Sequence, residues 1–235
     1  MNLGSVGFGL RHLSHAYSYM KDSYTFADKI HSFTGSSYDD IRSLDQEAKL
    51  FIKSLRIQIG AGPELKCRAL YILIRLLKPD KIVETGVATG FTSSCILAAL
   101  DKNNKGHLYS IDLPIHSPRV DADGQMDMSI IPNNELPGYI IPSLLRNRWS
   151  LTLGKSEDKL PDLLDTIGAI DMFFHDSEHS YSNMMFELNE SLSHIQKEGI
   201  IASDDVNYNT AFQEFCIENS LAYDTICYLG LAKLI

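Results

Sequence analysis

From residue 80 onward, short apolar stretches recur along the sequence, and most are followed by a segment with helical spacing. The stretches "KIVET", "GHLYSID", "SLTLG", "IDMFFH" and "GIIAS" have the β-branched and aromatic character of buried strands. Strands that alternate with helices need crossover connections, which build a mainly parallel sheet covered by helices on both faces. This alternation is the feature that most restricts the fold.

The end of the chain departs from this pattern. The stretches "YDTICYL" and "LAKLI" both read as strands, and they lie too close together for a helix to fit between them. We therefore expect an antiparallel hairpin there. The predicted fold class is α/β: doubly wound, with a mainly parallel seven-stranded sheet and a C-terminal antiparallel hairpin.

Two segments lie outside this scheme. Residues 38–59 and 63–77 have helical spacing, so residues 1–60 are predicted to form an N-terminal helical extension to a domain of residues 61–235. This extension would serve as a substrate cap or as the contact of a homo-oligomer. Residues 113–149 carry five prolines and are too long for an ordinary connection. We interpret this insertion as a substrate lid, with a partly disordered or oligomer-contacting loop as the alternative.

Composition excludes several classes of function. The net charge is −9 with no compensating basic stripe, which argues against a nucleic-acid partner. No segment is long and apolar enough to predict a membrane span, and the N-terminus lacks the continuous apolar core of a signal peptide. The 4 cysteines are widely spread without a CxxC pair. We expect a soluble, reduced and cytoplasmic protein with a small-molecule partner.

The stretch "VETGVATGFTS" predicts a cofactor-binding turn between a strand and a helix. Its glycine spacing is G-x-x-x-G, not the G-x-G-x-x-G of dinucleotide sites, and Glu84 before the first glycine suits a positively charged ligand better than a diphosphate. Asp112 ends the next strand, where it can accept hydrogen bonds from both hydroxyls of a ribose. A cationic group and a ribose together point to S-adenosylmethionine (SAM). The alternative is a plain turn with a helix-capping aspartate.

With "LYSID", "LTLGKSEDKLPDLL", "IDMFFHD" and "IIASDDV", this turn resembles the successive motifs of the Rossmann-like class I SAM-dependent methyltransferases. The similarity is greatest to the metal-dependent O-methyltransferases of the catechol and antibiotic-sugar types, and it covers residues 80–206. It implies that Glu84 contacts the methionine amino group, that Thr92 and the glycine turn hold the carboxylate, and that Ser156 lies at the adenine. The expected cofactor contacts are Glu84, Gly86, Val87, Gly90, Thr92, Asp112, Ser156 and Asp176.

The stretch "HDSEH" allows two interpretations. It matches the H-x-x-E-H pattern of some zinc peptidases, which requires both histidines on one helical face. However, "IDMFF" has the character of a strand, and a helix is predicted to begin only at about Ser180. In the other interpretation, Asp176 and the pair Asp204–Asp205 end neighbouring strands and form an all-oxygen site suited to Mg²⁺, with Mn²⁺ or Ca²⁺ as alternatives. The resemblance assigns these three carboxylates as metal ligands, although the family usually has Asp-Asn or Glu-Asp at the pair.

His179 follows Asp176 by three residues, at the position where the resemblance places a catalytic lysine or histidine. We expect it to act as general base on a hydroxyl of the acceptor, while a surface histidine that caps the next helix is the alternative. The predicted reaction is metal-dependent O-methylation, favouring the vicinal diol of a catechol or a sugar. A nicotinamide-dependent oxidoreductase and a non-catalytic cofactor-binding protein are the alternative functions.

Overall fold

The computed structural model describes residues 25–58, 60–124, 126–127 and 130–234. The first 24 residues of the predicted extension therefore lie outside the described part of the chain. Within that part, no helix combines the length and the apolar character that crossing a membrane would need.

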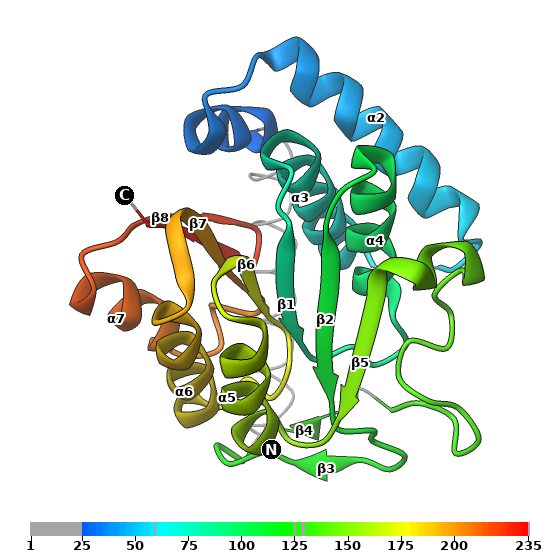
Figure 1. The fold of residues 1–235 in the computed structure, drawn as a ribbon, viewed down its shortest axis with the longest axis vertical. Helices are drawn as coiled ribbons and strands as arrows, with labels where there is room; N and C mark the ends of the chain where they lie inside the picture. The colour runs from blue at the N-terminus through cyan, green and yellow to red at the C-terminus, as the bar shows by residue number, and fades with distance from the viewer. Residues whose placement is uncertain (1–24, 59, 125, 128–129, 235) are drawn as a thin grey trace, which may run out of the picture.

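A seven-stranded sheet forms the centre of the molecule, in the order β5-β2-β1-β6-β7-β9-β8 (Figure 1). Strands β5, β2, β1, β6 and β7 pair in parallel, whereas β9 pairs antiparallel with both β7 and β8. The predicted mainly parallel sheet with its C-terminal hairpin is confirmed. The strands of this sheet are β1 (Lys81–Thr85), β2 (His107–Asp112), β5 (Trp149–Leu153), β6 (Ile170–His175), β7 (Ile195–Ser203), β8 (Ala222–Ile226) and β9 (Leu229–Lys233).

Helices cover both faces of the sheet (Figure 1). One face carries α2 (Tyr38–Ser54), α3 (Ala61–Leu77) and α4 (Phe91–Asn103), and the other carries α5 (Ser156–Ile167), α6 (Tyr181–Leu192) and α7 (Ala211–Glu218). Residues 25–34 add a further helix, whose Phe26 and Ile30 are buried in the same core cluster as α3 and α4. The described part of the N-terminal extension is thus continuous with the core of the α/β unit.

Alternation along the strands divides the core into two halves. Ile82 of β1 and Phe174 of β6 lie in the cluster with α3 and α4, whereas Val83 and Phe173 lie in the cluster with α5 and α6. Because the central strands are buried on both faces, they read as continuous apolar runs rather than as alternating ones. This is why "KIVET" and "IDMFFH" could be recognised as strands.

Helix α6 ends earlier than expected. The apolar spacing of "SYSNMMFELNESLSHIQ", residues 180–196, predicts one long helix. However, α6 ends at Leu192, and Ile195 already pairs with Ile170 as the first residue of β7. A short turn separates the two elements, in which the His194 N–H donates to the Ser191 carbonyl at 3.0 Å. Ile195 continues the apolar spacing of the helix, but the sheet buries it instead. Helix α2 likewise ends at Ser54, before the predicted residue 59.

The proline-rich insertion contains two short strands, β3 (Arg119–Val120) and β4 (Met126–Asp127), and the 3-10 helix η1 (Ser143–Arg148). Figure 1 places β3 and β4 beside the carboxyl ends of the parallel strands. The later part of the insertion packs against the domain: Ile141 is buried, and the Gly138 N–H donates to the carbonyl of Ala88 at 2.9 Å. The role of the insertion as a lid stays a prediction.

Candidate functional site

The turn after β1 is shaped by two glycines with positive φ. Gly86 has φ +83° and Gly90 has φ +91°, a region that side chains with a Cβ rarely adopt. A Cβ on Gly86 would lie 2.0 Å from the backbone oxygen of Asp176, and a Cβ on Gly90 would lie 2.6 Å from the Cα of Gly138. The turn therefore touches the end of β6 on one side and the insertion on the other.

Asp112, the last residue of β2, holds this turn in place. Its Oδ2 accepts hydrogen bonds from the backbone N–H groups of Val87 at 2.6 Å and Ala88 at 2.9 Å. These N–H groups belong to the loop before α4, where backbone donors lack helical partners. Asp112 thus fixes the loop and also lines the neighbouring cavity.

A cavity of about 670 Å³ lies over the carboxyl ends of the parallel strands. Roughly 300–1,000 Å³ is usual for a ligand pocket, and this edge is where such sheets bind their ligands. Of the eleven residues predicted for the cofactor, metal and base roles, six line this cavity and five do not. Those that line it are Gly86, Val87, Thr92, Asp112, Ser156 and Asp176; those that do not are Glu84, Gly90, His179, Asp204 and Asp205.

Glu84 lies beneath the turn and is fully buried. Its Oε2 accepts hydrogen bonds from the hydroxyls of Ser93 at 2.8 Å and Ser110 at 2.7 Å, while Oε1 has no partner among the described residues. Burial raises the pKa of Glu84 to about 7, although the two hydroxyls lower it. A buried carboxylate oxygen without a partner is suited to a donor from a ligand.

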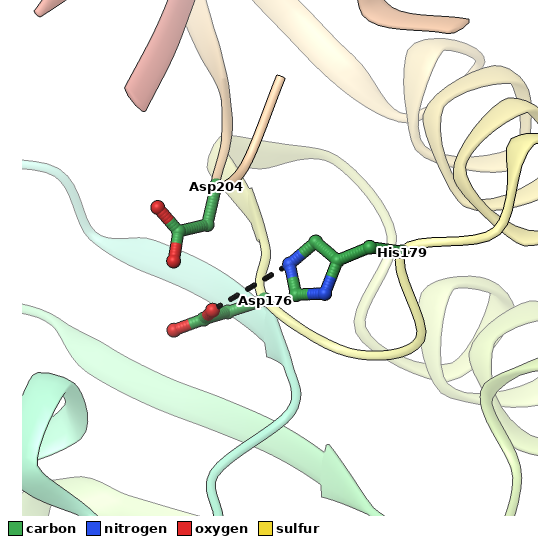
Figure 2. A group of neighbouring side chains, drawn as sticks. All are labelled: Asp176, His179 and Asp204. Carbon is green, nitrogen blue, oxygen red and sulfur yellow. Dashed lines mark ion pairs between the residues drawn. The ribbon is translucent and has the colours of Figure 1, made fainter. Parts of the chain in front are cut away.

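The predicted acidic residues follow β6 and β7 directly. The Asp176 N–H donates to the Thr85 carbonyl at 2.8 Å and the Asp204 N–H donates to the His175 carbonyl at 2.8 Å, which continues the strand ladder by one residue. Figure 2 shows the Asp176 and Asp204 carboxylates side by side, with the imidazole of His179 directed toward Asp176. One ligand atom from each of these three residues lies within 4.8 Å of the others, a spacing that could hold a metal ion.

Lys66 of α3 reaches into the same cluster, a contact that was not predicted from the sequence. Its Nζ lies 2.9 Å from Asp176 Oδ2 and also donates to Asp204 Oδ2. Burial would lower the pKa of Lys66, but the two carboxylates outweigh it and raise that pKa well above its ordinary value. Burial raises the pKa of Asp176, whereas for Asp204 the opposing effects of Lys66 and of hydrogen bonds prevail and lower the pKa.

Asp205 does not join the metal-sized group formed by Asp176, His179 and Asp204. Its backbone is left-handed, with φ +50°, and its Oδ2 lies 4.0 Å from His179 Nε2. Burial, followed by the charge of Asp204, raises the pKa of Asp205 to about 7. The structure thus groups the carboxylates of Asp176 and Asp204 with the imidazole of His179 and the ammonium of Lys66, and the role of Asp205 as a metal ligand stays a prediction.

His179 lies in the loop before α6, and its Nε2 is buried without a hydrogen-bond partner among the described residues. Burial, followed by the charge of His175, lowers the pKa of His179 to about 4, so the imidazole is neutral near pH 7. His175 is the last residue of β6, so the two histidines do not share a helix. This placement removes the zinc-peptidase interpretation of "HDSEH".

A buried polar network supports the cluster from below. Glu187 of α6 accepts hydrogen bonds from His175 Nδ1 at 2.6 Å and from Ser177 Oγ at 2.6 Å, and also from Thr85 and Asn183. Glu187 and His175 are both fully buried. The network ties the end of β1, the end of β6 and α6 together beneath the cavity. Sequence reasoning missed it, although a glutamate on the apolar face of a helix is a usable signal.

Comparison with known proteins gives one family match. A family model described as "Methyltransferase domain" matches residues 83–206, which is more than half of the chain. This range contains the glycine turn, Asp112, Ser156 and the acidic residues that follow β6 and β7. Among curated proteins, no sequence matches this chain significantly.

Several solved structures share the fold at low sequence identity. An O-methyltransferase from Bacillus cereus in complex with SAH is 12% identical, with a TM-score of 0.51 over 90% of this chain and 97% of that one. The calicheamicin methyltransferase CalS11 is 14% identical, with a TM-score of 0.53 over 82% and 91%. The O-methyltransferase TomG from Streptomyces achromogenes, in complex with SAM, is 14% identical, with a TM-score of 0.51 over 81% and 89%. At such identities these likenesses establish the fold.

Proposed function

The chain belongs to the methyltransferase domain family, and from this premise we propose that it transfers the methyl group of SAM to a hydroxyl oxygen of a small molecule. The membership agrees with the resemblance drawn from the sequence and favours methyl transfer over the oxidoreductase and the non-catalytic alternatives. Similar folds include O-methyltransferases whose structures contain SAM or SAH, and this supports the proposed donor.

One observation carries the proposal: Asp176 belongs both to the cavity and to the polar cluster. From Asp176 the cavity extends past the glycine turn to Asp112 and Ser156, where we propose that the cofactor binds. The Asp176 carboxylate also faces Lys66, Asp204 and His179, and we propose that the acceptor hydroxyl lies beside these residues. A methyl group held near Asp176 would thus lie between the cofactor and the acceptor.

In the proposed reaction the acceptor oxygen attacks the methyl carbon of SAM. The S–CH₃ bond breaks as the O–CH₃ bond forms, the sulfonium becomes a thioether, and the hydroxyl proton passes to the neutral imidazole of His179. Because the sulfonium already activates the methyl group, alignment of the two reactants is the main contribution, worth about 7–11 kcal/mol. Lys66 would stabilise the negative charge that develops on the acceptor oxygen.

The sequence also predicted Mg²⁺ and an acceptor with two adjacent oxygens that a metal could chelate. The donors of Asp176, Asp204 and His179 are close enough for a cation, but the ammonium of Lys66 already contacts both carboxylates. A divalent cation and an ammonium repel each other at such short range. The residues as arranged do not fit the metal, so no step of the proposed reaction involves one.

The proposal is tested by incubating the protein with SAM and a panel of phenols, catechols, sugars and amines. Mass spectrometry is expected to find S-adenosylhomocysteine (SAH) together with an O-methylated product. His179→Ala is expected to reduce kcat by about 10²–10⁴-fold, the usual contribution of a general base, without weakening SAH binding. Methylation of amines alone would contradict the proposal.

A further inference from the structure

We propose that the ammonium of Lys66 is the built-in cation of this site and takes the place of a divalent metal between Asp176 and Asp204. The inference goes beyond the proposed function because it assigns the cation of the site to the chain itself and changes the class of acceptor that the site favours. The part of the inference that concerns the methyl acceptor rests on the proposed function. The part that concerns the cation does not, because binding of a cation to the site can be measured without turnover.

The contacts of Lys66 are those of a bound cation. Its Nζ lies 2.9 Å from Asp176 Oδ2 and also donates to Asp204 Oδ2, so one ammonium bridges the carboxylates that directly follow two neighbouring strands. The side chain of Lys66 is only 11% exposed, and those of Asp176 and Asp204 are 18% and 13% exposed. Buried carboxylates require a compensating positive charge, and here the chain supplies it.

The backbone of α3 holds Lys66 in this position. Its neighbours Leu65 and Cys67 are fully buried, so the helix cannot rotate without exposing the core. Two residues further on, Arg68 binds Asp45 of α2 through two hydrogen bonds, of 2.6 Å and 3.1 Å. The ammonium also lies 5.9 Å from the centre of the Phe174 ring, which adds a favourable cation–π contact.

Among the residues that the structure describes, the remaining donors are too few for a hard divalent cation while Lys66 is in place. Mg²⁺ requires near-octahedral oxygen coordination. Asp176 and Asp204 each give one oxygen to the ammonium, Asp205 lies outside the cluster, and His179 offers a nitrogen. The cluster has the composition of a site whose cation is already present.

An ammonium in place of a metal changes the expected class of acceptor. A metal favours an acceptor with two adjacent oxygens because it can coordinate both at once, whereas the ammonium would donate a hydrogen bond to one acceptor oxygen. The acceptor therefore needs only a single hydroxyl, and a vicinal diol offers it no advantage. Phenols and isolated alcohols thus become substrates as good as catechols.

The direct test is the binding of Mn²⁺, followed by electron paramagnetic resonance of the free ion and by calorimetry. Wild-type protein and Lys66→Met are titrated side by side, since methionine keeps the apolar stem and removes the charge. Lys66→Arg, which keeps the charge, and Lys105→Met, which removes a lysine paired with Asp80 at the other end of the sheet, are the controls. Only Lys66→Met is expected to bind Mn²⁺ at least about tenfold more tightly than wild type, because it leaves two carboxylates without a cation.

The proposal is overturned if wild-type protein binds Mn²⁺ at micromolar concentration with Lys66 intact. It is also overturned if Lys66→Met binds the ion no better than wild type. Should Lys66→Met fail to fold, Lys66→Gln takes its place, and the titration of wild type alone still decides. In the activity assay, methyl transfer by wild type is expected to persist in EDTA, and its loss on metal removal counts against the inference.

A parallel titration with SAH separates this inference from the proposed function. If SAH does not bind, the methyltransferase proposal fails, while the Mn²⁺ titrations still judge the role of Lys66. If SAH binds and wild type also takes up Mn²⁺ tightly, the function stands and the built-in cation is wrong. The two proposals therefore fail through different measurements.

Discussion

Gly86 faces the backbone of Asp176 so closely that a Cβ at this position would lie 2.0 Å from the Asp176 carbonyl oxygen. The glycine turn after β1 is thus in direct backbone contact with Asp176 of the polar cluster, so a shift of one requires a shift of the other. Because the obstacle is backbone rather than a flexible side chain, it cannot be relieved by a change of rotamer.

Gly86→Ala is accordingly expected to destabilise the fold by at least about 3 kcal/mol, as the sum of left-handed strain and steric overlap. Gly35→Ala is the matched control, since Gly35 has φ +72° and nothing within 4 Å of a built Cβ, and it should cost only about 1–2 kcal/mol. Urea denaturation measures both. Equal losses would show that the contact with Asp176 is unimportant.

Asp112→Ala is expected to weaken SAH binding about 10- to 100-fold, because a charge-assisted hydrogen bond is worth about 1.5–3 kcal/mol. The substitution releases the N–H groups of Val87 and Ala88, so the turn loses its shape before the cofactor arrives. Calorimetry with SAH checks it, with the exposed Asp101→Ala as control. An unchanged Kd would mean that the turn is held by other contacts.

Glu84→Gln is expected to make the protein more stable at pH 8. The pKa of Glu84 is about 7 in the fold, against 4.5 for an ordinary glutamate, so the unfolded chain ionises first. Stability from this group is full below pH 4.5, falls as the pH rises toward 7 and is then constant, at a cost on the order of 3 kcal/mol. Glutamine does not ionise, so the variant keeps its free energy of unfolding over this range. Its stability relative to wild type should therefore rise between pH 4.5 and 7.

The same variant is expected to bind SAH about tenfold more weakly, because the resemblance to SAM-dependent methyltransferases implies that the Glu84 carboxylate contacts the methionine amino group. Glu84→Gln is therefore expected to raise the free energy of unfolding measured by denaturation and to weaken the SAH affinity measured by calorimetry. If stability rises but binding is unchanged, Glu84 is a purely structural residue.

Glu187→Gln is expected to destabilise the protein by about 2–3 kcal/mol at pH 7, since Glu187 accepts hydrogen bonds from His175 and Ser177. Burial would raise the pKa of Glu187, but His175 and the hydroxyl donors outweigh it and lower that pKa below 4.5. The stabilisation is thus present above pH 4.5 and is lost as the pH falls through the folded-state value. Urea titrations between pH 7 and pH 3.5 should show the gap closing, with the exposed Glu218→Gln showing none.

The sequence predicted the sheet because buried parallel strands leave a local signature. In β6 six successive residues lie between clear turn signals, and the predicted strand coincides with the observed one. Helix boundaries were less accurate, since Ile195 satisfies the helical spacing of α6 and also the register of β7. The local spacing is compatible with both a helix and a strand at Ile195, and the pairing of Ile195 with Ile170 in the sheet selects the strand.

The candidate site was predicted only as far as the strand ends. Asp176 and Asp204 follow β6 and β7, so topology alone brings them together. Lys66 approaches them across 110 and 138 residues of sequence, and such a contact depends on how α3 packs. Its one local signal was a charged residue among the buried residues Leu65, Cys67 and Leu70 of an apolar helix.

Whether the cavity over the strand ends binds SAM is measured by titrating SAH into the protein by calorimetry in EDTA. NADH is titrated in parallel as a control with the same adenosine part. SAH is expected to bind at micromolar concentration, and NADH is expected not to bind. Binding of NADH without SAH, or binding of neither, would contradict the assignment of this cavity to SAM.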